Sequence, residues 1–461
     1  MSDLPTDTPV QSRAPSLARL AEDLAAGRTT ARALVEDCLA RIDDPAGEGA
    51  RAFILVDHAG ARDAADAQDL LRKAGAAPSP FAGIPLAVKD LFDIAGQTTT
   101  AGSRARAGFP PAARDAVAVA RLRAAGFVVV GRTNMTEFAY SGLGMNPHYG
   151  DPRAPFERPI GRVAGGSTSG GAVAVADRMA HAALGTDTGG SCRIPAAFCG
   201  ITGFKPTARR VPGDGAFPLS TTLDSVGPLG RTVGCCAVLD AILAGEDPVA
   251  PVPRPLTGLR LLVPTTVALE GLDTEVSDTF EDAVALLTRA GASVICGAVP
   301  EFDEIAPLNA KGGFTAAESY AVHRTLLDTK GALYDPRVSV RIRRGAGQDA
   351  ADYIQLAKAR ADLVRRARAR LAPYDALLLP TVAILPPKIA DLARDDDAYG
   401  RANLNALRNC TLINMIDGCA ISLPVSATGG APVGLMLAGA AGSDARILSI
   451  AAGVEATLAR A

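Results

Sequence analysis

Two glycine- and hydroxyl-rich clusters carry the strongest chemical signal in this sequence. They read GGSTSGG at residues 165–171 and GTDTGGS at residues 185–191. Glycine lets the backbone approach a ligand closely and adopt positive φ values. Successive N–H groups in such a loop can also point at one anion. The clusters therefore predict a site where serine hydroxyls and backbone donors meet a substrate.

Three kinds of site could use these loops. A nucleotide-binding loop requires GxxxxGK[ST] or GxGxxG after a strand, and neither pattern occurs here. A Ser-His-Asp hydrolase is typified by GxSxG, which frames none of Ser167, Ser169 and Ser191. The third kind is a serine nucleophile activated by a lysine. Lys89, in GIPLAVKD upstream of both clusters, is the lysine to consider.

These segments together resemble the amidase signature family. The likeness rests on GGSTSGGAVAVA, on ALGTDTGGSCRIPAAFCGITGFKPT and on the upstream GIPLAVKD. It covers a core of about residues 80–235, and weaker likeness in TNMTEFAYSGLGMNPHYG, DALLLPT and APVGLMLAG extends it almost to the C-terminus. The resemblance implies an amidase signature fold, which is α/β with a mixed, largely parallel central sheet flanked by helices on both faces.

The resemblance also implies a catalytic triad. Lys89 matches the family's catalytic base, Ser167 its bridging serine and Ser191 its nucleophile. The Gly166–Ser167 peptide bond is implied to be cis. Ser191 would attack an amide carbonyl while Lys89 accepts its proton through Ser167, giving an acyl-enzyme and releasing ammonia or an amine. The backbone N–H groups expected to form the oxyanion hole are those of Thr188, Gly189, Gly190 and Ser191.

A lysine can act as a base only if its pKa falls. The free amine has a pKa near 10.4 and is almost wholly protonated at pH 7, so a depression of about 3 units is needed. Burial depresses a lysine pKa in this way. Lys89 ends an apolar strand, so its side chain can point into a dry interior while Asp90 points to the opposite face. An ordinary solvated lysine is the alternative, as a turn serine is for Ser191.

Other residues near the clusters receive lesser roles. Asp187 and Arg193 flank Ser191, and we expect them to brace the loop by charge-assisted hydrogen bonds. Cys192 is expected to be a small buried hydrophobe and not a second nucleophile. We expect contact with the substrate from four residues, Tyr140, Met145, Thr168 and Ser169. For Tyr140 and Met145, and for His148 in the same loop, packing in the core is an equal alternative.

The resemblance leaves the substrate open. A small carboxamide is the main expectation, and urea-derived substrates such as carboxybiuret or allophanate are alternatives. Another is the A subunit of a glutamyl-tRNA amidotransferase, a glutaminase that passes ammonia to a partner. There we would expect an acid to hold the glutamine amino group, but Leu407 or Arg408 stands near that place in LNALRNCTLIN, which counts against glutamine. Arg408 could instead pair a substrate carboxylate.

The elements around the clusters follow an α/β pattern. Ser16 and Thr29 or Thr30 are expected to cap two helices within 16–44. A strand around Ile84–Val88, a helix near 116–125 and the strand FVVVG come next. A β-α-β unit is predicted after residue 258. It consists of the strand LRLLVP, a helix with Val276, Phe280, Val284 and Leu287 on one face, and the strand ASVIC. The pattern then continues with a long helix near 350–371 and the strand DALLLPT. It ends with the strands CAISLP and APVGLMLAG, joined by a turn at Gly429–Gly430, and a helix from about Ser443.

We expect one amidase domain over residues 1–461. The proline-rich stretch 246–258, EDPVAPVPRPLTG, is the one credible internal boundary and predicts a surface linker. The length and the 48% hydrophobic content suit a folded chain with a large core.

Composition excludes several function classes. The net charge of -2 offers no basic excess for nucleic acid. The four histidines show no metal-ligand spacing, so we expect neither a metal nor an organic cofactor. No apolar run reaches the ~20 residues of a membrane span, and the N-terminus is not a signal peptide. The eight cysteines lack CxxC spacing and are expected to be free and buried in a reducing, cytoplasmic compartment. A homodimer or a small partner subunit would suit the family.

Overall fold

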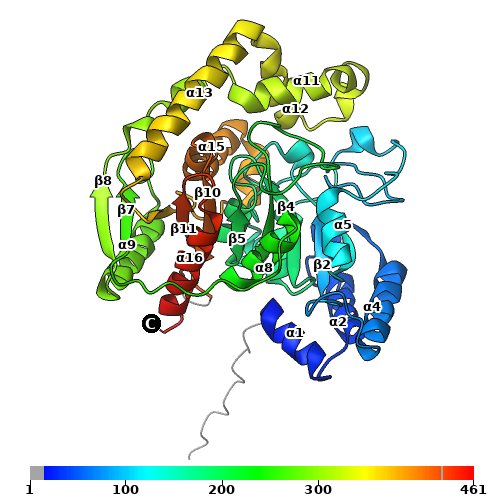
Figure 1. The fold of residues 1–461 in the computed structure, drawn as a ribbon. Coiled ribbons are helices and arrows are strands. Elements are labelled where there is room, and N and C mark those ends of the chain that lie inside the picture. Colours follow the sequence, from blue (N-terminus) through cyan, green and yellow to red (C-terminus); the bar gives the residue numbers. More distant parts are fainter. Residues whose placement is uncertain (1–14, 427–428, 461) are drawn as a thin grey trace, which may run out of the picture.

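A central sheet of eleven strands organises the chain. The computed structural model describes residues 15–426 and 429–460, and within them the strand order is β1-β3-β2-β4-β6-β5-β10-β11-β9-β7-β8 (Figure 1). The strands are β1 Phe53–Val56, β2 Pro85–Lys89, β3 Val128–Thr133, β4 Ala182–Asp187, β5 Thr202–Lys205, β6 Ser225–Gly230, β7 Arg260–Pro264, β8 Ser293–Gly297, β9 Ala376–Pro380, β10 Cys419–Pro424 and β11 Gly434–Gly439.

The sheet is mixed, as predicted, but it is not largely parallel. Parallel pairing occurs only toward its two ends, in β2–β3, β2–β4, β7–β8 and β7–β9, and the edge strand β1 pairs antiparallel with β3. The pairs through the middle, from β4–β6 to β11–β9, are antiparallel. The 206–224 connection between β5 and β6 forms no helix, and strands joined without a crossover pair antiparallel. The expectation of a mostly parallel sheet is therefore wrong for the centre.

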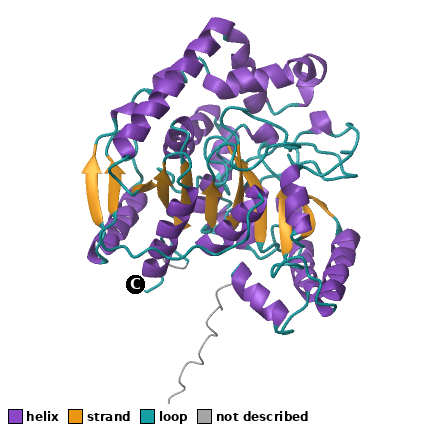
Figure 2. Cartoon of the chain, in the orientation of Figure 1, coloured by secondary structure: helices purple, strands orange, loops and turns teal. Residues whose placement is uncertain are grey.

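Helices cover both faces of this sheet (Figure 2). One face packs against α1 Leu17–Ala25, α5 Val117–Ala124, α8 Val233–Ala244, α9 Thr274–Arg289 and α16 Asp444–Leu458. The other packs against α2 Ala31–Asp43, α3 Gly49–Ala52, α4 His58–Lys73, α6 Ser169–Ala176, α7 Arg193–Cys199 and α15 Asp396–Met415. The remaining helices are α10 Ile305–Leu308, α11 Gly313–Lys330, α12 Pro336–Arg343, α13 Ala350–Leu371 and α14 Ile389–Arg394.

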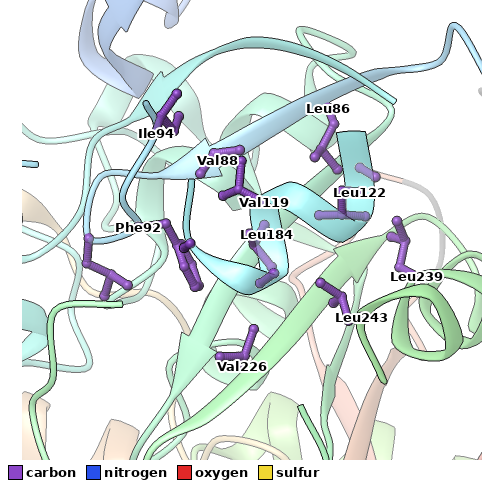
Figure 3. Close-up of a cluster of buried hydrophobic side chains, with 14 of the residues drawn as sticks. Leu86, Val88, Phe92, Ile94, Val119, Leu122, Leu184, Val226, Leu239 and Leu243 are labelled. Atoms are coloured by element: carbon purple, nitrogen blue, oxygen red, sulfur yellow. The ribbon is translucent and has the colours of Figure 1, made fainter. Parts of the chain in front are cut away.

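Strand β2 shows how the two faces are divided. Leu86 and Val88 point into an apolar cluster with Val119 and Leu122 of α5 (Figure 3), whereas Ala87 lies in the cluster on the other face, with α6. Side chains alternate along a strand. Lys89 therefore follows Ala87 toward the α6 face, where the first serine cluster lies.

The predicted elements are found close to their expected positions. Ser16 accepts a hydrogen bond from the Arg19 N–H and Thr30, of the two threonines considered, accepts one from the Ala33 N–H. The β7-α9-β8 unit has the parallel pairing expected of it. Helices α13 and α16 and the β10–β11 hairpin also match their predictions.

Three further features concern the surface and the thiols. The stretch 246–258 forms neither helix nor strand, and strands from both sides of it join the same sheet. All eight cysteines are free, but Cys296 is exposed, so the expectation of buried thiols fails at that residue. No helix in the described part of the chain is long and apolar enough to cross a membrane.

Candidate active site

Lys89 is buried at the end of β2 without a counter-charge. Its Nζ donates to Ser167 Oγ at 2.8 Å and to Thr186 Oγ1 at 2.9 Å. Among the described residues no carboxylate forms an ion pair with it; neighbouring Asp90 pairs instead with Arg132 at 2.6 Å. Burial lowers the pKa of Lys89 to about 8. A lysine with this pKa has a substantial neutral fraction near neutral pH and can accept a proton.

Thr186 is a partner of Lys89 that the sequence did not reveal. It lies on β4, two residues after Leu184, which packs in the cluster with α5 and α8. Strand alternation alone places Thr186 on that same face, away from Lys89. Only the hydrogen bond shows that the lysine side chain reaches it at the strand end.

The loop bearing Ser167 is tied to its neighbours through the backbone. The Gly166–Ser167 peptide bond is cis, as the resemblance implies. The Ser167 carbonyl accepts from the Thr136 N–H at 3.1 Å, and the Thr168 N–H donates to the Ser191 carbonyl at 3.3 Å. The fold thus couples Lys89 to Ser167 by side chains, and the Ser167 loop to the Ser191 loop by the backbone.

Asp187 and Arg193 hold the Ser191 loop, which confirms their predicted bracing role. Both are fully buried, and Arg193 Nε and Nη2 donate to the two oxygens of Asp187 at 3.0 and 2.9 Å. Asp187 also accepts from the N–H groups of Gly190 and Cys192. Although burial opposes it, the charge of Arg193 holds the pKa of Asp187 well below its usual value, so the pair stays ionised.

The hydrogen bond from Gly190 corrects the expected oxyanion hole. Its N–H donates to Asp187 Oδ1 at 2.9 Å, so this donor is already in use. Gly190 has φ +126°, and a Cβ there would lie 2.6 Å from Cys410 Cβ, so glycine is needed for the shape of the loop. The donors that the oxyanion hypothesis retains are the N–H groups of Thr188, Gly189 and Ser191.

Thr188 is fixed by a carboxylate that the sequence did not reveal either. Its hydroxyl donates to Asp224, which further accepts from the N–H groups of Leu219 and Ser220. Burial raises the pKa of Asp224 to about 6. Glu318 of α11 accepts from the Ser220 hydroxyl and so holds the same turn from the other side. Helix α11 is therefore linked to the Ser191 loop through one turn.

Cys192 behaves as the predicted buried hydrophobe. It lies in the apolar cluster with α6, and burial raises the pKa of its thiol far above the usual value. The thiolate, which is the reactive form, is therefore suppressed.

The candidates for substrate contact occupy different environments. Tyr140 is half-buried and its hydroxyl donates to Thr315 of α11 at 3.3 Å, while Met145 is buried in an apolar cluster. His148 lies within 2.9 Å of buried Glu137. The hydroxyls of Thr168 and Ser169 are buried and have no partner among the described residues. Met145 and His148 thus make packing or polar contacts of their own, and contact with a substrate stays a prediction for all of these residues.

Access to Ser191 is narrow. Along residues 179–199 every residue is buried except Gly189, which is partly accessible. A Cβ on Gly189 would lie 3.4 Å from Leu407 Cδ2 and 3.5 Å from Thr411 Oγ1. Both side chains come from α15 and are only half-buried. Leu407 and Thr411 therefore wall the accessible side of the Ser191 loop, a role the sequence indicated only through the missing acid near Leu407.

Comparisons with known proteins show which family the chain is similar to. A family model described as Amidase matches residues 33–448. The chain is 37% identical to 2-amino-5-chloromuconic acid deaminase of Comamonas testosteroni, covering 96% of each chain. It is 35% identical to the A subunit of glutamyl-tRNA(Gln) amidotransferase from Chloroflexus aggregans, covering 93% of each chain.

Solved structures match over nearly the whole chain. A crystal structure of an amidase superposes with a TM-score of 0.86 and 32% identity, covering 96% of this chain and 99% of that one. Native peptide amidase from Stenotrophomonas maltophilia superposes with a TM-score of 0.79 and 28% identity, covering 97% and 98% of the two chains.

Proposed function

Because this chain belongs to the amidase family and is a hydrolase of carbon–nitrogen bonds, we propose that it cleaves a small carboxamide through an acyl-enzyme on Ser191. Ser167 relays the proton and Lys89 is the base. The observation that carries this proposal is the fully buried Lys89 amine, 2.8 Å from Ser167 Oγ and without a carboxylate partner among the described residues.

The chemical steps follow from these positions. Neutral Lys89 takes a proton from Ser167 as Ser167 takes the proton of Ser191, and Ser191 Oγ bonds to the amide carbon. The carbonyl oxygen becomes negative and is stabilised by the N–H groups of Thr188, Gly189 and Ser191. The C–N bond then breaks, and Lys89 returns its proton to the leaving nitrogen through Ser167. Water attacks the ester in the same way and frees the acid.

Two other substrate classes need to be separated from this one. The amidotransferase relatives suggest glutamine as the amide. The resemblance predicts an acid near Leu407 or Arg408 to hold the amino group, and the apolar Leu407 beside Gly189 counts against that substrate. The Comamonas relative suggests an amino-substituted dicarboxylic acid, from which hydrolysis removes the amino group. Its 37% identity over 96% of the chain supports this class as the second candidate.

Release of ammonia by the purified protein tests the proposal. The panel comprises glutamine, asparagine, malonamide, benzamide, indoleacetamide, allophanate, a short peptide amide and an aminomuconic acid. We expect activity on one group, and its loss in Ser191→Ala. Undiminished hydrolysis by Ser191→Ala would exclude Ser191 as the nucleophile.

A further inference from the structure

Helix α15 presents a strip of three incompletely buried residues beside the Ser191 loop. Between residues 406 and 416 all others are buried, and only Leu407, Arg408 and Thr411 are half-buried. Leu407 and Thr411 face Gly189, the accessible point of that loop. An acyl group on Ser191 that leaves the loop on the side of Gly189 passes along this strip.

Arg408 is the charged member of the strip, and its charge is not balanced. Its Nη2 atom is buried and has no acceptor among the described residues, and its Nε donates to Asn409 Oδ1 at 3.3 Å. Burial lowers the pKa of Arg408, and the charge of Glu270 opposes this without forming an ion pair with Arg408. By contrast, the equally half-buried Arg158 is clasped by Asp177 at 2.6 and 2.9 Å. A partly buried cation without an acceptor is costly unless an anion binds it.

The position of Arg408 suits an anion on the substrate. Residues three apart on a helix surface have Cβ atoms about 5–6 Å apart, so Arg408 lies next to Thr411, which faces Gly189. A guanidinium offers two parallel N–H donors that match a carboxylate. The strip thus combines an apolar contact near Ser191 with a cation farther along.

Resting on the proposed amide hydrolysis, we propose that Arg408 binds a carboxylate of the substrate, remote from the scissile C–N bond, while Leu407 contacts the carbon chain between them. The substrate class is the monoamide of a dicarboxylic acid. Glutamine shares the carboxylate but adds an ammonium group, for which Leu407 provides no acceptor.

A matched set of amides tests this assignment. Glutaramate, pentanamide and glutamine share one chain length and differ only in the carboxylate and the amino group. We expect the wild type to prefer glutaramate. Arg408→Gln should lower kcat/KM for glutaramate by about 10- to 150-fold, mainly through KM, because a hydrogen bond to a charged group is lost. Hydrolysis of pentanamide should change by less than about 2-fold, which also shows that the variant is folded.

Two further variants complete the design. Arg408→Lys keeps the positive charge but lacks the two parallel N–H donors of a guanidinium, so it should recover part of the kcat/KM that Arg408→Gln loses on glutaramate. Arg401→Gln removes an exposed arginine of the same helix and should behave as wild type. Equal effects of Arg408→Gln on glutaramate and pentanamide would overturn the assignment while leaving amide hydrolysis intact.

The assignment can also be tested without turnover. Binding of glutarate to Ser191→Ala, measured by calorimetry, should weaken by a similar factor when Arg408→Gln is added. If the wild type hydrolyses no amide, the proposed function fails, but this binding measurement still decides the role of Arg408. Glutarate that binds equally with and without Arg408, or not at all, contradicts it.

Discussion

Lys89 and Arg193 are buried cations close to Ser191, and their surroundings give them opposite properties. Arg193 is clasped by Asp187 and remains charged, which fixes the loop. Lys89 has two hydroxyl partners and no carboxylate, so burial lowers its pKa to about 8. The same low-polarity interior thus keeps one cation as a brace and leaves the other able to exchange a proton.

The pKa of Lys89 predicts the pH dependence of the reaction. The base must be neutral in the free enzyme, and Lys89 becomes neutral as the pH rises through about 8. We therefore expect kcat/KM to increase with pH and to level off above that value. Lys89→Ala should lower turnover by orders of magnitude with an unchanged circular dichroism spectrum. A profile that is flat between about pH 6 and pH 10 would contradict the role of Lys89.

The Asp187–Arg193 pair predicts a large effect on stability. Asp187→Asn leaves the buried Arg193 without its counter-charge, so we expect the free energy of unfolding to fall by about 3–5 kcal/mol in denaturant titrations. Asp37→Asn is the control, because the Asp37–Arg41 pair is exposed and should contribute less than about 1 kcal/mol. Equal losses in the two variants would contradict the bracing role.

For single residues, the sequence predicted which side chains belong to the candidate site better than it predicted their hydrogen-bond partners. Spacing and resemblance predicted Lys89, Ser167 and Ser191 as the triad, because the two glycine-rich loops leave a distinct pattern, and the structure places Lys89 Nζ beside Ser167 Oγ. Thr186 and Asp224 could not be identified, since each lies on or beside a strand whose packing decides where its side chain reaches. The hydrogen bond from the Gly190 N–H to Asp187 likewise depends on the folded shape of the loop.

Helix α15 is the element of the second half of the chain that contacts both serine-bearing parts of the site, beside the link that α11 makes through Glu318. Asn403 Oδ1 accepts from the Ser141 hydroxyl and from the Gly142 N–H, and Asn414 contacts Asp187 at 3.1 Å. The Gly142 carbonyl in turn accepts from the Gly166 N–H. One face of the helix therefore positions both serine-bearing loops and supplies the wall at Leu407.

Substitution of Asn403 tests whether α15 holds the two serine-bearing loops. Asn403→Ala leaves a buried N–H without an acceptor, and we expect a loss of about 1–3 kcal/mol in the free energy of unfolding, with lower turnover. Asn405→Ala, a half-buried position on the same helix, should change the free energy by less than about 0.5 kcal/mol. If both variants keep wild-type stability and rate, α15 does not hold these loops.

One continuous sheet runs through the described part of the chain. The candidate active site lies beside strands from the first half of the sequence, and the Leu407 and Thr411 wall comes from the second half. Helix periodicity and β-α-β spacing predicted β2 and β3 near one end of the sheet and β7 and β8 at the other, because parallel strands need crossovers that leave a pattern. The antiparallel edge strand β1 was not predicted. Of the antiparallel centre, only the β10–β11 hairpin was predicted. Strand β5 is short, and the direction in which it meets β10 depends on packing far along the chain.

The continuity of the sheet predicts that a cut in the surface stretch 246–258 is tolerated. Val249 and Val252 are exposed there, and β5 remains paired with β10 across the cut. After cleavage at a protease site introduced at residues 247–251, we expect both fragments to elute together and kcat/KM to stay within about 2-fold. Dissociation under native conditions would show that the two halves do not share a sheet.

The most direct test of the central claim is covalent labelling by a fluorophosphonate, with the modified residue identified by mass spectrometry. The mechanism predicts a single label on Ser191, a rate of labelling that rises with pH through about 8, and strongly reduced labelling in Lys89→Ala. Labelling of another serine, or an unchanged rate in Lys89→Ala, would contradict the activation of Ser191 by Lys89 through Ser167.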